Sequence, residues 1–285
     1  MDAITIKQAL RQAQHTLYGN ESAQIDSELL LACALGCTRT HLYTWPERQL
    51  TSSQQSYFES LLDRRVMGEP IAYVTGEREF WTLTLRVNRH VLIPRPETEL
   101  LVETALSLLP AHIQRVADLG TGSGAIALAL AKERPDWEIY ASDLSPDALR
   151  VASDNALTHE LSNVHFNLGS WCEALPSEPL AMIISNPPYI DPQDSHLSQG
   201  DLRCEPRGAL SSEESGIADI RTIISQAPTH LTRGGWLLLE HGFAQASVVR
   251  ELLVAIGFSN VKTLQDLNGM DRVSMGRKPL NRPKL

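Results

Sequence analysis

The sequence predicts an α/β protein that carries a helical region at its N-terminus. Three observations support this class. Apolar residues recur at helical spacing through roughly the first seventy residues. From residue 115 onward, helical segments alternate with short, almost uniformly apolar runs, which are typical of strands buried on both faces of a sheet. The first of these runs leads into a glycine-rich turn that opens a helix.

Three helices are expected in the N-terminal region. The face of the first is marked at 3.6-residue spacing by Ile6, Ala9, Leu10, Ala13 and Leu17. The second covers residues 26–35 and is expected to end at Gly36. The third starts at Thr51, where Thr51-x-x-Gln54 has the pattern of a capping box, and continues to Gly68.

A change of pattern after residue 73 predicts a linker. Apolar positions there alternate at strand spacing and indicate a β-hairpin, namely Phe80, Leu83, Leu85 and Val87. Residues 94–99 then begin a helix, with Pro96 early and acidic residues in the first turn. We expect a helical domain at 1–72, a hairpin linker at 73–95, a second domain at 96–277 and a disordered tail at 278–285.

Short apolar runs place the strands of the second domain. They cover residues 115–117, 138–142, 180–185, 236–240, 261–264 and 272–275. Helices are expected at residues 125–131, from Ser145 onward, and at 244–256 with an end near Gly257. Alternation of this kind builds a sheet covered by helices, with ligands bound at the carboxyl ends of its central strands.

The apolar run 180–185 ends in Asn186-Pro187-Pro188-Tyr189, the most informative tetrapeptide of the chain. Each proline fixes its own φ and restricts the residue before it, so the loop is stiff. We expect the Asn186 side-chain oxygen, the Pro187 carbonyl and the Tyr189 ring to be held together. Two acceptors beside an aromatic face suit a planar –NH2 group of a side-chain amide or a nucleobase. The alternative is a proline-rich turn without chemistry.

A second motif, Asp118-Leu119-Gly120-Thr121-Gly122-Ser123-Gly124, makes that alternative weaker. Its glycines let the backbone turn sharply near a ligand, and its amides are expected to face that ligand at a helix N-terminus. Dinucleotide and phosphate sites use similar turns. The spacing here is G-x-G-x-G rather than G-x-G-x-x-G, and no Lys-Ser/Thr pair follows.

Asp143 ends the next strand, where its carboxylate is placed to accept hydrogen bonds from ribose hydroxyls. Capping of the helix that starts near Ser145 is a second, compatible role. A ribose-binding acid, a glycine turn and a site for a planar nitrogen together suggest S-adenosylmethionine as the cofactor. The predicted reaction is methyl transfer to nitrogen.

These motifs, in this order, resemble the class I methyltransferases of the amino type. Further matches lie at residues 76–81 (GEREFW), 93–99 (IPRPETE) and 237–242 (LLLEHG). With them, the chain from about residue 20 to residue 277 resembles the HemK/PrmC family, the release factor glutamine methyltransferases. The resemblance implies a Rossmann-like seven-stranded methyltransferase sheet with an antiparallel final strand, and a substrate-recognising helical domain. It also implies methylation of the N5 amide of the Gln in the Gly-Gly-Gln loop of class I release factors.

The resemblance assigns roles to individual residues as well. The cofactor loop falls on Gly120, Thr121, Gly122, Ser123 and Gly124, with Asp118 at its base. Asp143 takes the ribose position, and Trp171 takes the place beside the adenine. The catalytic and substrate-binding positions fall on Asn186 to Tyr189, and Asn186 also lies near the cofactor.

One position departs from the family pattern. Members usually have Asp-Trp where this chain has Ser170-Trp171, so a carboxylate that accepts from the adenine amino group is absent. Ser170 offers a weaker hydrogen bond, and we expect modestly weaker cofactor binding rather than loss of activity. A cofactor-binding scaffold without catalysis is the alternative that this substitution leaves open.

Composition agrees with an enzyme of the cell interior, and we expect a cytoplasmic monomer. The length of 285 residues suits two domains, no stretch reaches membrane-spanning length, and the start lacks a signal peptide. A net charge of −9 argues against stable nucleic-acid binding. No metal is expected, because no C-x-x-C pair occurs among Cys33, Cys37, Cys172 and Cys204.

Two rival activities share both motifs. A ribosomal-protein glutamine methyltransferase is the closer one, and the form of residues 94–97 favours release factors only by resemblance. A nucleobase amino-methyltransferase should carry a basic DNA-reading module, which this chain lacks. Residues 191–215 follow the Asn-Pro-Pro-Tyr loop and form either the substrate entrance or an ordinary surface loop.

Overall fold

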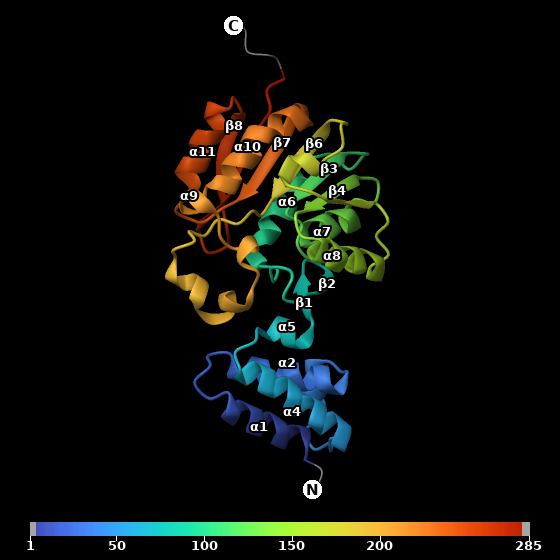
Figure 1. Cartoon of the computed structure of the whole chain (residues 1–285). Helices are drawn as coiled ribbons and strands as arrows, with labels where there is room; N and C mark the ends of the chain where they lie inside the picture. The colour runs from blue at the N-terminus through green and yellow to red at the C-terminus, as the bar shows by residue number, and fades with distance from the viewer. Residues whose placement is uncertain (1–3, 281–285) are drawn as a thin grey trace. The chain divides into compact units, whose positions relative to one another are not determined.

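The computed structural model describes residues 4–280 of the chain. The chain divides into two compact units, with the boundary between Glu77 and Arg78. In Figure 1 the first unit is the blue-to-cyan group of helices, and the second is the α/β unit coloured from green to red. Each unit has a buried apolar core of its own.

The first unit is helical, as predicted. Its helices are α1 (Ile6–Thr16), α2 (Ala23–Leu35), α3 (Arg39–Thr44), α4 (Ser52–Val66) and α5 (Ile71–Thr75). Thr51 and Gln54 form the predicted capping box, in which each side chain bonds the backbone N–H of the other. Gly36 adopts a left-handed conformation, with φ of 62°, and ends α2. Helix α3 was not predicted.

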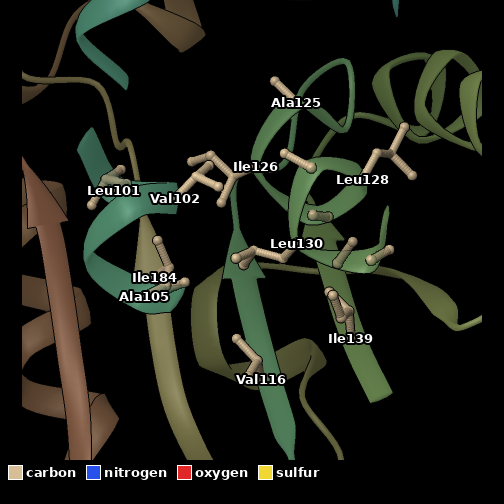
Figure 2. Packing of buried hydrophobic residues seen from close by; sticks show 14 of the residues in the cluster. Leu101, Val102, Ala105, Val116, Ala125, Ile126, Leu128, Leu130, Ile139 and Ile184 are labelled. Atoms are coloured by element: carbon tan, nitrogen blue, oxygen red, sulfur yellow. The ribbon is translucent and has the colours of Figure 1, made fainter. Parts of the chain in front are cut away.

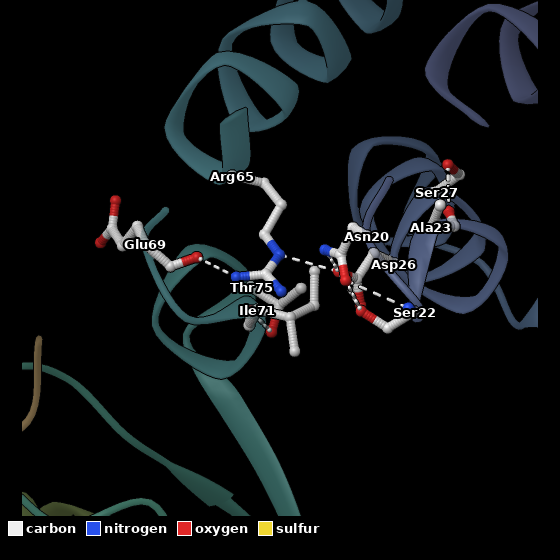
Figure 3. Close-up of polar contacts among 9 residues, drawn as sticks. All are labelled: Asn20, Ser22, Ala23, Asp26, Ser27, Arg65, Glu69, Ile71 and Thr75. Atoms are coloured by element: carbon white, nitrogen blue, oxygen red, sulfur yellow. Dashed lines mark hydrogen bonds and ion pairs between the residues drawn. The ribbon is translucent and has the colours of Figure 1, made fainter. Parts of the chain in front are cut away.

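A buried ion pair joins α4 to α2 inside this unit (Figure 3). The guanidinium of Arg65 donates to Asp26 Oδ2 over 2.8 Å, and Asp26 is only 2% exposed. The same oxygen accepts hydrogen bonds from Asn20 and Ser22, and Arg65 also donates to the Glu69 carbonyl. One oxygen of the buried carboxylate thus accepts three hydrogen bonds, one of them from a guanidinium, which offsets the cost of burying its charge.

The linker starts later than predicted. Residues 73–75, assigned to the hairpin, belong to α5, because Pro70 opens a helical turn whose Ala72, Tyr73 and Val74 are buried. Gly76, with φ of 81°, ends that turn. The predicted hairpin itself is confirmed as a two-stranded sheet of β1 (Glu77–Phe80) and β2 (Leu83–Arg86).

The second unit contains a seven-stranded sheet in the order β5-β4-β3-β6-β7-β9-β8. Its strands are β3 (Arg115–Leu119), β4 (Glu138–Asp143), β5 (Val164–Leu168), β6 (Leu180–Ser185), β7 (Leu231–Glu240), β8 (Ser259–Gln265) and β9 (Asp271–Arg277). Pairs from β5 through β7 are parallel, whereas β9 runs antiparallel to β7 and β8. The predicted Rossmann-like sheet with an antiparallel final strand is confirmed.

Helices cover both faces of this sheet. They are α6 (Glu99–Leu108), α7 (Ala125–Glu133), α8 (Pro146–Thr158), α9 (Glu213–Gly216), α10 (Ala218–His230) and α11 (Ala246–Ala255). On one face, α6 and α7 pack on Val116, Ile139 and Ile184, as Figure 2 shows. On the other, α10 and α11 pack on Ala117 and Ile183. Successive strand residues point to opposite faces, so each strand contributes to both cores.

Short 3-10 helices fill the connections. They are η1 (Pro96–Thr98), η2 (Trp171–Ala174), η3 (Ser195–Ser198), η4 (Gly200–Cys204) and η5 (Arg207–Ala209). The predicted tail starts too early, because the backbone of Lys278 bonds to Gly234 and Gly235. Residues 281–285 of that tail lie outside the described residues. No helix within residues 4–280 has both the length and the apolar character that a membrane span needs.

Asn155 of α8 ties three segments of the second unit together. It is completely buried, its Oδ1 accepts from Arg86 N over 2.8 Å, and its Nδ2 donates to the carbonyls of Arg86 and Ser123. One side chain thus joins the hairpin, the glycine loop and α8.

Asp118 carries a carboxylate in the middle of the same core. Its Oδ2 accepts from Thr121 Oγ1 over 2.7 Å and from Ala127 N over 3.2 Å, whereas its buried Oδ1 has no partner among the described residues. Burial raises the pKa of Asp118 from 3.8 to about 7, against the lowering effect of the two hydrogen bonds.

Replacing Asn155 by Ala should destabilise the second unit. The change leaves three backbone groups without partners, and each unsatisfied buried group costs about 1–3 kcal/mol. We expect the free energy of unfolding in urea to fall by about 3 kcal/mol. Asp154→Ala, on the exposed side of α8, should change it by less than about 0.5 kcal/mol. Equal effects of the two variants would contradict the assignment.

Asp118 should make stability fall as the pH rises. The unfolded chain loses this proton near pH 3.8, whereas the folded chain keeps it until about pH 7. Between these values the folded state binds one more proton, so the free energy of unfolding drops by roughly 1.4 kcal/mol per pH unit. Relative to Asp118→Asn, wild type should lose this stability in urea titrations from pH 5 to 7. Parallel profiles would refute the raised pKa; Asp154→Asn is the control.

Candidate active site

Strands β3 and β6 bring the two sequence motifs to one edge of the sheet. They are parallel neighbours, and Leu119 pairs with Ser185 in the register. The Ser185 hydroxyl also donates to the Leu119 carbonyl over 2.7 Å, and both residues are fully buried. Gly120 and Asn186, the residues that follow this pair, therefore leave the sheet side by side.

The glycine loop uses its amides inside the protein. The N–H groups of Gly120 and Thr121 both donate to the Ser142 carbonyl, over 2.8 and 2.9 Å. Gly122 N donates to Asp143 Oδ2 over 2.9 Å, and Gly124 N donates to the Thr121 carbonyl. The expectation that the loop amides face a ligand is wrong for these four groups, because the end of β4 and the loop itself already accept their hydrogens.

The loop glycines are required by backbone conformation and by space. Gly120, Gly122 and Gly124 have φ of 71°, 57° and 86°. A Cβ at Gly120 would lie 3.3 Å from the Trp171 ring, and one at Gly124 would lie 2.9 Å from Leu128. A Cβ at Gly122 would meet no atom within 4 Å. The loop is therefore pressed against Trp171 and α7 and is open only at Gly122.

Asp143 lies beside the loop and organises two backbone segments. Oδ2 accepts from Gly122 N, and Oδ1 accepts from Ser145 N over 2.9 Å. The cap of α8 is Ser145, whose hydroxyl accepts from Ala148 N, so Asp143 is not the capping residue. Each carboxylate oxygen keeps a further lone pair for a ligand.

Trp171 forms the wall opposite the glycine loop. It opens η2 in a left-handed conformation, with φ of 44°, which is rare for a bulky residue. The Cys172 amide bonds Gln226 of α10, and the Ser142 hydroxyl bonds the Trp171 carbonyl, so this conformation is held from both sides. Residues with backbone strain of this kind gather at ligand sites.

A cavity of about 590 Å³ lies between these elements. Of the predicted residues it is lined by Gly120, Gly122, Asp143, Ser170, Trp171, Asn186 and Pro188. The cavity lining does not include the other predicted residues, namely Asp118, Thr121, Ser123, Gly124, Pro187 and Tyr189. The sequence analysis missed further lining residues, namely Arg89, His90, Val91, Leu92, Leu144, Ser145, Ala148, Gly169, Pro206, Gly208, Ala209 and Asp219. Leu92, Leu144, Ser145 and Gly169 adjoin recognised motifs. Pro206, Gly208 and Ala209 lie within residues 191–215, for which the sequence left open a substrate entrance or a surface loop.

The two ends of the Asn-Pro-Pro-Tyr loop are held by buried side chains. Asn186 Nδ2 donates to Thr98 Oγ1 over 3.1 Å, and the Tyr189 hydroxyl donates to Glu240 Oε1 over 3.3 Å. Burial raises the pKa of Glu240 to about 7 and the pKa of Tyr189 above its ordinary value. The Tyr189 ring packs against the apolar core below α10 and α11.

Residues 190–216 form a strap that we define by its anchors. Ile190 pairs with Ser211, and the buried carboxylate of Glu205 accepts from Ile93 N over 3.0 Å and from the Arg95 guanidinium. Gly216 fits against the Tyr189 carbonyl, which a Cβ would meet at 2.1 Å. Because Pro206, Gly208 and Ala209 line the cavity, the strap is part of its wall rather than an unrelated surface loop.

Metal-binding geometry is missing from the described part of the chain. No three side chains of His, Cys, Asp or Glu within residues 4–280 are grouped as a metal site would need. Cys33, Cys37, Cys172 and Cys204 are thiols rather than members of disulfides. The cavity lining offers carboxylate, amide, hydroxyl and aromatic groups, together with the guanidinium of Arg89 and the imidazole of His90.

Family models match both parts of the chain. A model described as PrmC N-terminal domain matches residues 8–76, and one described as Methyltransferase small domain matches residues 96–201. The chain is 50% identical over 268 residues to the release factor glutamine methyltransferase of Escherichia coli (strain K12), covering 94% of this chain and 97% of the relative. It is 50% identical over 273 residues to the protein of that name from Pseudomonas aeruginosa, covering 96% and 98%.

Solved structures share the fold at low identity. The hMettl16 catalytic domain, solved with the MAT2A 3'UTR hairpin 1, superposes with a TM-score of 0.58 at 16% identity, covering 78% of this chain and 82% of that one. A methyltransferase from Pyrococcus furiosus gives a TM-score of 0.54 at 18% identity, covering 78% and 99%. On the full-length identity to its relatives, the chain belongs to the release factor glutamine methyltransferases, a family of S-adenosylmethionine-dependent enzymes.

Proposed function

We propose that this enzyme transfers the methyl group of S-adenosylmethionine to the side-chain amide nitrogen of the Gln in the Gly-Gly-Gln loop of class I release factors. One observation carries the proposal: Asn186, which begins the Asn-Pro-Pro-Tyr loop, lines the same cavity as Gly120, Gly122 and Asp143. A methyl donor held by the glycine loop and an amide held by Asn186 therefore share one space. The names of the relatives support the substrate.

The residues of the cavity fit the cofactor. Asp143 has lone pairs for the ribose hydroxyls, and the Trp171 ring offers an apolar wall for the adenine, with Ser170 beside it. Four N–H groups of the loop already donate hydrogen bonds within the protein, so they are not available to bind a pyrophosphate. This arrangement suits a methyl donor that carries positive charge. Asp118 acts from behind, by holding the Thr121 hydroxyl and the Ala127 amide.

The chemistry rests on positioning. S-adenosylmethionine supplies an electrophilic methyl on a sulfonium, which leaves as the neutral thioether of S-adenosylhomocysteine. An amide nitrogen is a poor nucleophile because its lone pair is delocalised. We assign Asn186 Oδ1, whose residue lines the cavity, as the acceptor for one N–H group of the target amide. The Pro187 carbonyl, which follows it in the loop but is not part of the cavity lining, is assigned to the other N–H group, and Pro188 and Tyr189 keep the loop rigid. Orientation of this kind supplies up to about 7–11 kcal/mol of a barrier.

The proton balance needs no catalytic His or Lys. As the new N–C bond forms and the S–C bond breaks, the nitrogen becomes positively charged and acidic. Its excess proton leaves to water. His241 is buried, and both of its ring nitrogens form hydrogen bonds, one with Gly242 O and one with Ser274 Oγ. We therefore assign it a structural role.

The biological setting follows from the substrate. Methylation of a release factor places the enzyme in translation termination and in the cytoplasm, where release factors act. We assign recognition of the release factor to the helical domain at residues 1–72, and we expect a monomer without stable nucleic-acid or membrane partners. The net charge of −9 supports the nucleic-acid part.

The substrate can be tested directly. Methyl-labelled S-adenosylmethionine should be offered with a class I release factor, a ribosomal protein or DNA, and the label located by mass spectrometry. We expect label only on the Gln of the Gly-Gly-Gln loop. A release factor with that Gln replaced by Glu is the matched control. Label on the ribosomal protein or on DNA instead would replace the proposal by the corresponding rival, and no label on any would indicate a scaffold.

Asn186→Ala should separate catalysis from cofactor binding. Loss of one preorganised hydrogen-bonding group lowers turnover by about 10²-fold or more in other enzymes, and we expect a loss of that size with release factor as substrate. The dissociation constant for S-adenosylmethionine should change by less than about threefold, because the loop and Asp143 remain. Near-normal turnover of the variant would defeat the mechanism.

Ser170→Asp should strengthen cofactor binding. A carboxylate at this position of the cavity wall accepts from the adenine amino group more strongly than a hydroxyl does. We expect calorimetric affinity for S-adenosylmethionine to rise by about threefold to tenfold, equivalent to roughly 1 kcal/mol. Ser177→Asp adds the same charge at an exposed position outside the cavity and should leave affinity unchanged. Unchanged or weaker binding by Ser170→Asp would contradict the expectation.

A further inference from the structure

We propose that Thr98 and Glu240 are positioning residues that decide which atom of the Asn186 side-chain amide faces the cavity. The inference deepens the proposed function and rests on it. Neither residue lines the cavity, and both come from elements outside the Asn-Pro-Pro-Tyr loop: Thr98 ends η1, and Glu240 ends β7. Their exposed fractions are 4% and 1%.

One hydrogen bond fixes the orientation of the Asn186 side-chain amide. Its side chain has one acceptor, Oδ1, and one donor group, Nδ2. The Nδ2 atom donates to Thr98 Oγ1 over 3.1 Å. With Nδ2 committed to Thr98, Oδ1 is the atom left for the cavity, and an acceptor is what an incoming amide N–H requires. The reverse orientation would present a donor to a donor.

The Thr98 hydroxyl interacts with both Asn186 and Glu240. A hydroxyl has a single hydrogen, so it can accept from Asn186 only while its hydrogen points elsewhere. The Glu240 carboxyl lies close enough to the Thr98 hydroxyl for that hydroxyl to lower the pKa of Glu240, against the larger effect of burial. We assign the hydroxyl hydrogen to this carboxyl, because its buried Oε2 has no other hydrogen-bond partner among the described residues.

Glu240 also holds the other end of the Asn-Pro-Pro-Tyr loop. The Tyr189 hydroxyl donates to Glu240 Oε1 over 3.3 Å. The Glu240 carboxyl thus accepts a hydrogen bond from Tyr189 directly and is connected to Asn186 through Thr98. The first and last residues of the tetrapeptide are therefore linked to the same buried carboxyl. When the Glu240 carboxyl is ionised it can only accept, so Tyr189 and Thr98 both donate to it. The Thr98 hydroxyl then accepts from Asn186 Nδ2, which turns Asn186 Oδ1 toward the cavity.

Thr98→Val tests the connection with little change of volume. We expect turnover on release factor to fall about 10–100-fold while affinity for S-adenosylmethionine stays within threefold. Thr98→Ser keeps the hydroxyl and should stay within threefold of wild type. Thr104→Val, also at a buried threonine of the adjoining helix α6, is the matched control and should be fully active. Wild-type turnover of Thr98→Val would overturn the proposal, as would equal loss in Thr104→Val.

A double-mutant cycle distinguishes positioning from general destabilisation. If Thr98 acts through Asn186, Thr98→Val should cost less than about twofold in turnover once Asn186 is already Ala. Multiplication of the two single effects would show that Thr98 acts elsewhere and would overturn the proposal.

A spectroscopic measurement keeps this test apart from that of the substrate. In 15N-labelled protein, the Asn186 side-chain amide resonance, identified by its absence in Asn186→Ala, should shift in Glu240→Gln and in Thr98→Val but not in Thr104→Val. An unshifted resonance would overturn the positioning role even if the enzyme is active. A shifted resonance in a protein that leaves release factors unmethylated would uphold the positioning role and sink the proposed function alone.

Discussion

The parallel register of β3 and β6 is the constraint on which the site depends. Leu119 pairs with Ser185, and the Ser185 hydroxyl locks that register by bonding the Leu119 carbonyl. A slip of one residue would turn every side chain of the strand to the opposite face, which the two buried cores forbid. The loops that follow the strands therefore start from neighbouring points, and Gly120 and Asn186 line one cavity.

The glycine loop owes its shape to bonds within the protein rather than to a ligand. Four of its amides donate to Ser142, Asp143 and Thr121, so the loop is preorganised before any cofactor binds. The same bonds remove the cluster of free N–H groups that attracts phosphate at a helix N-terminus. The cavity lining does include the Asp143 carboxylate and the Trp171 ring, and both kinds of group attract a sulfonium cation.

Carboxylates that are hard to ionise surround this site. Asp118 and Glu240 are both fully buried, and burial raises the pKa of each to about 7. Burying these carboxyl groups lowers stability, but each of them orients another side chain. Asp118 accepts from Thr121 of the glycine loop, and Glu240 accepts from Tyr189. Glu205 has the corresponding place on the strap, where it binds Ile93 and Arg95. Buried carboxyl groups thus connect the site to the chain segments around it.

The sequence by itself determined the fold class, the motifs and every strand of the large sheet except β5, because periodicity and glycine or proline positions are local properties. It could not show that the loop amides are already bonded, that helix α5 precedes the hairpin, or that residues 89–92 and Pro206, Gly208 and Ala209 line the cavity. It also could not single out Thr98 and Glu240. These facts depend on contacts between residues far apart in the chain, such as Asn186 with Thr98. Only the tertiary structure decides such contacts, since they are set by how strands pair and helices pack rather than by any short stretch of residues.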